Sequence, residues 1–124
     1  MTTRYLSSPF LLSALGRGKT VAQLLSVSDG PDSRVVRHVA LWREGETCVV
    51  ALHCVRDMSD RLADVTEWPS VDGSEEHGVG VWTRFASVED ALVWVESELG
   101  GSRARFVNHG VIQDEIYQAL ARPR

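Results

Sequence analysis

The chain contains few of the residues that mark secreted, membrane-spanning or nucleic-acid-binding proteins. Only two of its 124 residues are cysteine, which excludes a disulfide-rich secreted scaffold. No apolar run approaches the roughly 20 residues that a membrane-spanning helix needs, and the run Phe10–Leu12 is too short for a secretory signal. Lysine occurs once, at Lys19, and isoleucine and asparagine are also scarce, a bias that indicates a GC-rich bacterial genome. We therefore expect a cytoplasmic bacterial protein that makes no membrane contact.

What is present is the composition of an ordinary globular domain. Hydrophobic residues make up 44% of the chain and charged residues 24%, which suits a packed core and argues against disorder. There is no internal repeat, low-complexity tract or long linker, so residues 1–124 are expected to form a single domain. The formal net charge of −4 repels phosphate backbones, although it leaves room for a local basic patch. Nucleic acid is therefore an unfavoured partner that composition alone does not exclude.

Three apolar runs in the first half of the chain predict an antiparallel meander. They cover Lys19–Ser28, Arg34–Arg43 and Glu46–Arg56, and the last two are rich in β-branched residues and tryptophan. Turn-forming residues separate them at Asp29–Asp32 and at Glu44–Gly45. Sequential strands joined by such short turns pair with one another, so a three-stranded sheet results.

The alternation within these runs predicts which side of the sheet is buried. With Glu44 and Gly45 as the tight loop, Trp42 would pair with Thr47 and His38 with Ala51. The opposite face, interrupted by Arg37, is nearly all apolar and is expected to pack against helices. That face comprises Val35, Val39, Leu41, Cys48, Val50, Leu52 and Cys54. The two cysteines lie roughly 20 Å apart along one strand, too far for a disulfide.

Two helices are predicted in the second half. Residues 87–99 carry apolar side chains at helical spacing, and Ser87 with Asp90 resembles a capping box. A terminal helix is predicted over residues 112–121, with acidic residues in its first turn. The expected fold class is therefore α+β: the meander plus one or two further strands, with both helices packed on one face.

Shorter elements complete this expectation. Ser8 and Pro9 favour a short helix through Leu15, since serine caps well and proline suits the first helical turn. Alternating residues predict a strand over Val79–Phe85, and Arg103–Val107 is a candidate for one more. The sequence leaves the fold of residues 1–18 and 57–78 largely undetermined.

The tripeptide Gly18-Lys19-Thr20 resembles the end of a phosphate-binding P-loop. The required first glycine is replaced by Ser13, and the hairpin signals contradict the parallel βαβ sheet that a P-loop needs. A glycine-rich turn accounts for the tripeptide better. Asn108–Gly110 is likewise a compact polar turn that turn chemistry explains without catalysis. No cofactor is expected.

A winged helix-turn-helix fold is an alternative to the meander. Residues 9–15, 20–27 and 33–42 would then be three helices, and the third would present Arg34, Arg37, His38 and Arg43 to DNA. The valine-rich run and the acidic total charge speak against this DNA-binding arrangement.

His38 and His53 offer a second alternative, a small enzyme or a metal-binding protein. The meander places both imidazoles on one sheet face near Trp42, but two ligands do not make a metal site. Cys54, beside His53 and near Asp57, has the residue type of a thiol nucleophile, yet neighbouring strand residues point to opposite faces. We expect no catalytic residues and no metal site.

The preferred hypothesis is a non-enzymatic module that binds another protein through an acidic surface. Helix 87–99 and the loop before it carry carboxylates with few cations nearby in sequence, and two tryptophans could anchor an interface. Such a surface suits a basic partner, as in an immunity protein or antitoxin. The candidate partner-binding residues are Trp68, Glu75, Glu76, Glu89, Asp90, Trp94, Glu96 and Glu98. The oligomeric state is not predicted.

Overall fold

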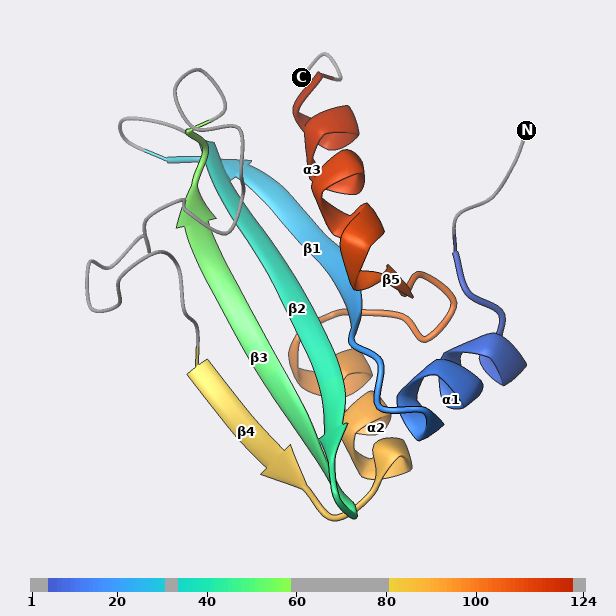
Figure 1. The fold of residues 1–124 in the computed structure, drawn as a ribbon. Helices are drawn as coiled ribbons and strands as arrows, with labels where there is room; N and C mark the ends of the chain where they lie inside the picture. The colour runs from blue at the N-terminus through green and yellow to red at the C-terminus, as the bar shows by residue number, and fades with distance from the viewer. Residues whose placement is uncertain (1–4, 31–33, 59–80, 122–124) are drawn as a thin grey trace.

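The fold is a five-stranded antiparallel sheet with helices on both faces (Figure 1). The computed structural model describes residues 5–30, 34–58 and 81–121. In these residues the strand order is β4-β3-β2-β1-β5, and every neighbouring pair is antiparallel. The strands are β1 (Val21–Asp29), β2 (Arg34–Glu44), β3 (Thr47–Arg56), β4 (Val81–Phe85) and β5 (Val107–Asn108). The helices are α1 (Ser8–Gly16), α2 (Val88–Glu98) and α3 (Ile112–Ala121), the last preceded by the 3₁₀ turn η3 (His109–Val111).

The α+β class and the three-stranded meander are thereby confirmed, and the helix-turn-helix arrangement is wrong. Two of its three proposed helices, 20–27 and 33–42, fall on β1 and β2. Valine-rich sequence with two-residue alternation pairs well across a sheet, and this pairing overrides the helical interpretation of the same apolar runs. Among the described residues there is consequently no recognition helix at Arg34 and Arg37.

The β2–β3 register differs from the predicted one by two residues. Glu44 pairs with Thr47, so the turn is Gly45-Glu46 and not Glu44-Gly45, and His38 pairs with His53. Gly45 adopts a left-handed φ of 62°, which a glycine at the first turn position accommodates without steric cost. Because the shift is an even number, every residue keeps its predicted face. The shift therefore changes only which residues of β2 and β3 lie opposite each other.

The helices pack on opposite faces of the sheet, where both had been expected on one. One core cluster joins α1 and α2 to Val39, Leu41 and Val50, the face that the sequence predicted to be buried. The second cluster joins α3 to Val36 and Val55, from the alternate positions of the same strands. Apolar residues at the end of the second face remote from the β2–β3 turn pack against α3, whereas the two histidines and Trp42 lie on this face nearer the turn.

The loop after α2 is fixed to β1 by a buried glutamine. Gln23 is only 1% exposed, and its side-chain amide donates to the Ser102 carbonyl at 2.7 Å and accepts from the Ser102 N–H at 2.8 Å. Gly101 packs so tightly beside it that a Cβ atom would lie 2.6 Å from Val95 Cγ1. The Arg103–Val107 segment is therefore mostly a tied loop, and only Val107 and Asn108 form strand β5.

The structure also bears on the two cysteines, the helix cap at Ser87 and the lengths of the helices. Cys48 and Cys54 are not joined by a disulfide, and burial raises the pKa of the Cys48 thiol to about 11. The capping serine is confirmed, because Ser87 Oγ accepts the Asp90 backbone N–H at 3.1 Å. No helix formed by the described residues has the length and apolar character needed to cross a membrane.

Candidate functional site

The acidic surface of α2 is only partly the one that the sequence predicted. Trp68, Glu75 and Glu76 lie outside the described residues. Trp94 is half-buried and packs against the core under α2, with its ring 5.4 Å from that of Phe85. It therefore serves the fold and does not stand outward as an interface anchor.

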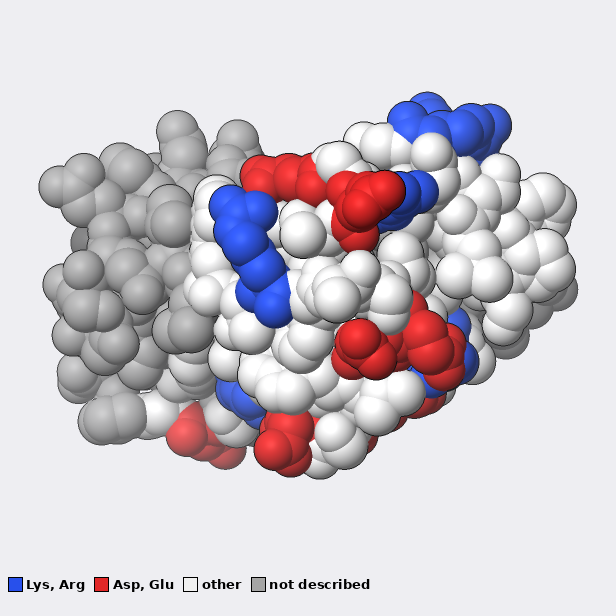
Figure 2. Space-filling model, turned by 90° about the horizontal axis from the view of Figure 1, so that it is seen from below, with Lys and Arg blue, Asp and Glu red and all other residues white. Residues whose placement is uncertain are grey.

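Arg103 neutralises part of this surface. Its guanidinium bonds Glu89 at 3.0 and 3.2 Å and Glu96 at 3.0 Å, and its backbone N–H also donates to Glu96. The pKa of Glu96 is lowered, first by that backbone bond and then by the guanidinium. Asp90 and Glu98 stay exposed. Figure 2 accordingly shows carboxylates interspersed with basic groups at the lower end of the molecule, without a uniform acidic surface.

A different surface lies on the same sheet face as α3, nearer the β2–β3 turn, where Trp82 is exposed and Trp42, His38 and His53 are partly buried. We call Trp42, Trp82, His38 and His53 the tryptophan–histidine surface; the register places all four side chains on the same face of β2, β3 and β4. Trp82 is 52% exposed, and its ring meets Trp42 edge to face with centroids 5.2 Å apart. The Trp42 indole N–H donates to Glu44, which also pairs with Arg84. The two tryptophans thus form a fixed aromatic pair beside an ion pair.

The two histidines of this surface are stacked across the strands. Their ring centroids lie 4.8 Å apart with an interplanar angle of 19°. Burial lowers the pKa of His38 from 6.5 to about 3, with smaller contributions from the neighbouring His53 and His109. His38 is therefore neutral at pH 7. No group of three His, Cys, Asp or Glu side chains could hold a metal ion in the described part of the chain.

The proposed thiol arrangement is also not assembled by the strands. Cys54 pairs with Arg37 and His53 with His38, so the thiol and the imidazole project from opposite faces of β3. Asp57 bonds Arg34 at 3.2 Å. The three residue types that suggested a nucleophile therefore belong to separate environments.

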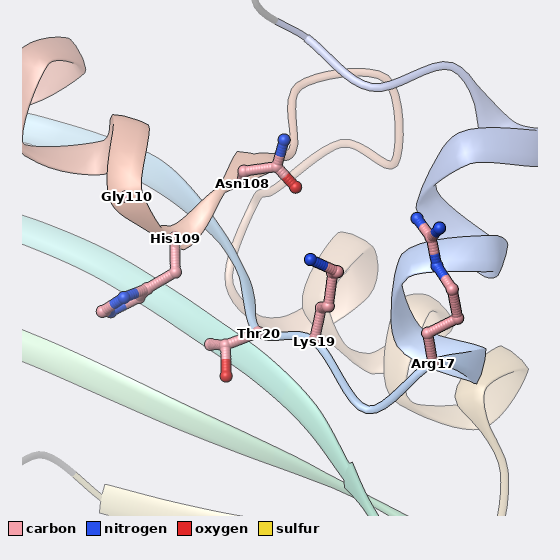
Figure 3. A pocket seen from close by; sticks show the side chains of 6 residues that line it. All are labelled: Arg17, Lys19, Thr20, Asn108, His109 and Gly110. Atoms are coloured by element: carbon pink, nitrogen blue, oxygen red, sulfur yellow. The ribbon is translucent and has the colours of Figure 1, made fainter.

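A hollow of about 370 Å³ opens beside this surface, between the end of α1 and the start of η3 (Figure 3). We call it the basic hollow. Figure 3 shows the Lys19 and Arg17 side chains extending to the side on which Asn108 lies, whereas the His109 ring turns away over the sheet. The lining residues are Arg17, Lys19, Thr20, Asn108, His109 and Gly110.

Backbone hydrogen bonds hold the walls of the hollow in place. Helix α1 ends in a Schellman motif: Gly18, with φ of 77°, donates to Leu15, and Lys19 donates to Ala14 at 2.9 Å. On the other wall, Asn108 pairs with Val21, and the His109 N–H donates to the Thr20 carbonyl at 3.2 Å. Two segments almost 90 residues apart in sequence are thereby joined.

The order of elements explains why Gly18-Lys19-Thr20 is not a P-loop. A P-loop follows a strand and opens a helix, whereas this tripeptide follows α1 and opens β1. Sequence reasoning did notice Lys19 and the Asn108–Gly110 turn separately. It missed that they share one hollow, because the pairing of β1 with β5 is a tertiary contact without a local signal.

Comparison with known protein families, with curated proteins and with solved structures found no match to this chain.

Proposed function

We propose that this chain is a non-enzymatic module that binds another protein through the tryptophan–histidine surface. The observation that carries the proposal is Trp82, a large aromatic side chain that is 52% exposed on a sheet face and held by Trp42 at 5.2 Å. Tryptophan is the residue type most enriched among side chains that dominate binding energy at protein interfaces. Because Trp82 lies in a strand and its ring packs against Trp42, it loses little conformational freedom on binding, which favours affinity.

The surroundings of Trp82 fit the same role. Arg84 and Glu44 form an ion pair at the rim, and the Trp42 indole N–H donates to Glu44. These polar groups therefore keep hydrogen-bond partners when another protein covers the two tryptophans. The partly buried rings of His38 and His53 stack on each other and lie on the same face along β2 and β3. An aromatic centre with a polar, internally satisfied rim is the common anatomy of a protein interface.

The nature of the partner follows from charge. The net charge of −4, with Asp90 and Glu98 exposed on α2, favours a partner with a basic surface. Because α2 packs on the other face of the sheet from Trp82, these carboxylates act at a distance and set the association rate more than the contact itself. A small acidic protein that masks a basic partner would serve as an immunity protein or antitoxin, and we propose that as the specific form of the function.

The test is affinity capture from a lysate of the source organism, followed by a binding measurement with the captured protein. Trp82→Ala is expected to weaken binding about 30-fold or more, the scale of an interface hot spot. Leu12→Ala is the matched control, because Leu12 is also 52% exposed but lies on α1. Equal losses for both variants, or no loss for Trp82→Ala, would reject the tryptophan–histidine surface as the interface.

The role of the acidic helix is tested separately. The double variant Asp90→Lys, Glu98→Lys is expected to slow association and flatten its salt dependence while leaving the dissociation rate nearly unchanged. A large increase in dissociation rate would instead identify α2 as the contact surface. If the captured partner is a nuclease or another toxic enzyme, adding stoichiometric wild-type chain should abolish its activity; undiminished activity contradicts the immunity-protein form.

A further inference from the structure

The basic hollow has features that protein docking at Trp82 does not use. It joins two cationic side chains, Arg17 and Lys19, to the amide of Asn108, and none of its six described lining residues is acidic. The volume of about 370 Å³ lies within the range of small-molecule sites. We propose that the basic hollow binds the phosphate group of a small organophosphate through Arg17, Lys19 and Asn108.

The charges of Arg17 and Lys19 are not used elsewhere in the described part of the molecule. Three of the other arginines bind carboxylates: Arg34 pairs with Asp57, Arg84 with Glu44, and Arg103 with Glu89 and Glu96. Arg43 and Arg105 donate to backbone carbonyls instead. Arg17 and Lys19 have no acidic partner among the described residues. In a chain of net charge −4, two adjacent cations without a carboxylate are a local reversal of sign, which attracts an anion.

The donor types match a phosphate group. A guanidinium presents a planar fork of N–H groups, an ammonium presents three, and a side-chain amide presents two. Figure 3 shows the Arg17 and Lys19 side chains extending on the side of the hollow where Asn108 lies. A phosphate group accepts hydrogen bonds in several directions at once, so it can engage all three side chains, and charge-assisted bonds of this kind are the strong ones.

The site is held in advance of binding. Gly18, in the left-handed conformation, ends α1. The Lys19 backbone N–H then donates to the Ala14 carbonyl at 2.9 Å, which fixes the backbone of Lys19. The His109 N–H bond to Thr20 sets the opposite wall, which carries Asn108. Binding therefore has to order side chains only, which limits the entropic cost.

An alternative is that Arg17 and Lys19 only stabilise the negative end of the α1 dipole. That role needs no ligand, and the two can be separated by titration. The probes are inorganic phosphate, adenosine monophosphate and adenosine, added at constant ionic strength to the full chain and followed by ¹⁵N–¹H chemical shifts. We expect saturable shifts at residues 17–20 and 108–110 with adenosine monophosphate, and at least tenfold weaker binding of adenosine.

Substitutions complete the test. Lys19→Gln and Arg17→Gln are each expected to weaken adenosine monophosphate binding about tenfold or more, whereas Lys19→Arg should retain most of it. Arg56→Gln is the matched control, since it removes one exposed cation at the far end of β3. Saturation by inorganic phosphate as well would identify the phosphate group alone as the ligand and supports the proposal. Shifts that do not saturate, equal loss with Arg56→Gln, or adenosine binding as tight as the monophosphate would overturn it.

Discussion

At the scale of single residues, two side chains are placed where their chemistry depends on burial. Burial beside His53 keeps His38 neutral. The side-chain amide of Gln23 forms both of its hydrogen bonds with the backbone of Ser102, in the loop after α2. The burial of Gln23 is tolerated because its amide is hydrogen-bonded to Ser102, and His38 is accommodated as the neutral imidazole. His38 is therefore expected to make the free energy of unfolding depend on pH, and Gln23 to make it sensitive to substitution.

His38 predicts acid sensitivity. Its pKa is about 3 in the folded chain against 6.5 in a free imidazole, so between these values the unfolded chain binds a proton that the folded chain does not. The stabilisation is complete above pH 6.5 and is lost as the pH falls toward 3, with a slope of up to about 1.4 kcal/mol per pH unit. Denaturant unfolding at several pH values measures it. His38→Gln should flatten this dependence, and parallel curves for the two proteins would contradict the burial of a neutral imidazole.

Gln23 predicts a costly core substitution. Gln23→Leu keeps the volume but leaves the Ser102 N–H and carbonyl without their partners, so we expect a loss of about 2–4 kcal/mol in the free energy of unfolding. Ser102→Ala is the control: it keeps both backbone bonds and removes only the hydroxyl that accepts from the Ala104 N–H. If both substitutions cost the same, the side-chain clamp does not secure the loop.

At the scale of elements, local sequence signals and tertiary contacts contributed different parts of the fold. The cap at Ser87, the left-handed glycines and the two-residue alternation are local, and they predicted α1, α2, α3 and the meander close to their observed bounds. The β2–β3 register was wrong by two residues, because Glu44-Gly45 and Gly45-Glu46 are both acceptable turns and only cross-strand packing decides between them. The placement of α3 opposite α2 could not be predicted for a similar reason, since Val36 and Val55 lie on a face that also carries two histidines.

The cap of α2 supplies the prediction at this scale. Ser87 Oγ accepts the Asp90 N–H, so Ser87→Ala leaves an unsatisfied donor in the first turn and should lower the free energy of unfolding by about 1 kcal/mol. Ser97→Ala is the matched control within the same helix, where the hydroxyl makes only a 3.5 Å contact to Trp94. Thermal unfolding of both variants measures the difference. An equal effect of the two substitutions would show that the cap does not stabilise α2.

At the scale of the whole molecule, the fold places three chemically different surfaces apart from one another. The sheet face toward α3 carries the tryptophan–histidine surface, the basic hollow lies at one side of it, and the mixed-charge surface of α2 lies on the opposite face. The sequence favoured α2 because four carboxylates lie on this one helix with few cations nearby in sequence, whereas Arg103, which neutralises two of them, comes from the following loop. The contact of Trp42 with Trp82 joins β2 to β4 across β3, and the sequence alone does not indicate it because the two residues are 40 positions apart.

The most direct test of protein binding at the tryptophan–histidine surface is hydrogen–deuterium exchange of the chain alone and in complex with its captured partner. Binding there should protect β3 and β4 around Trp82 and leave the exchange of α2 nearly unchanged. Protection concentrated on residues 88–98, with β4 exchanging as fast as in the free chain, would contradict the proposal and return the interface to the acidic helix.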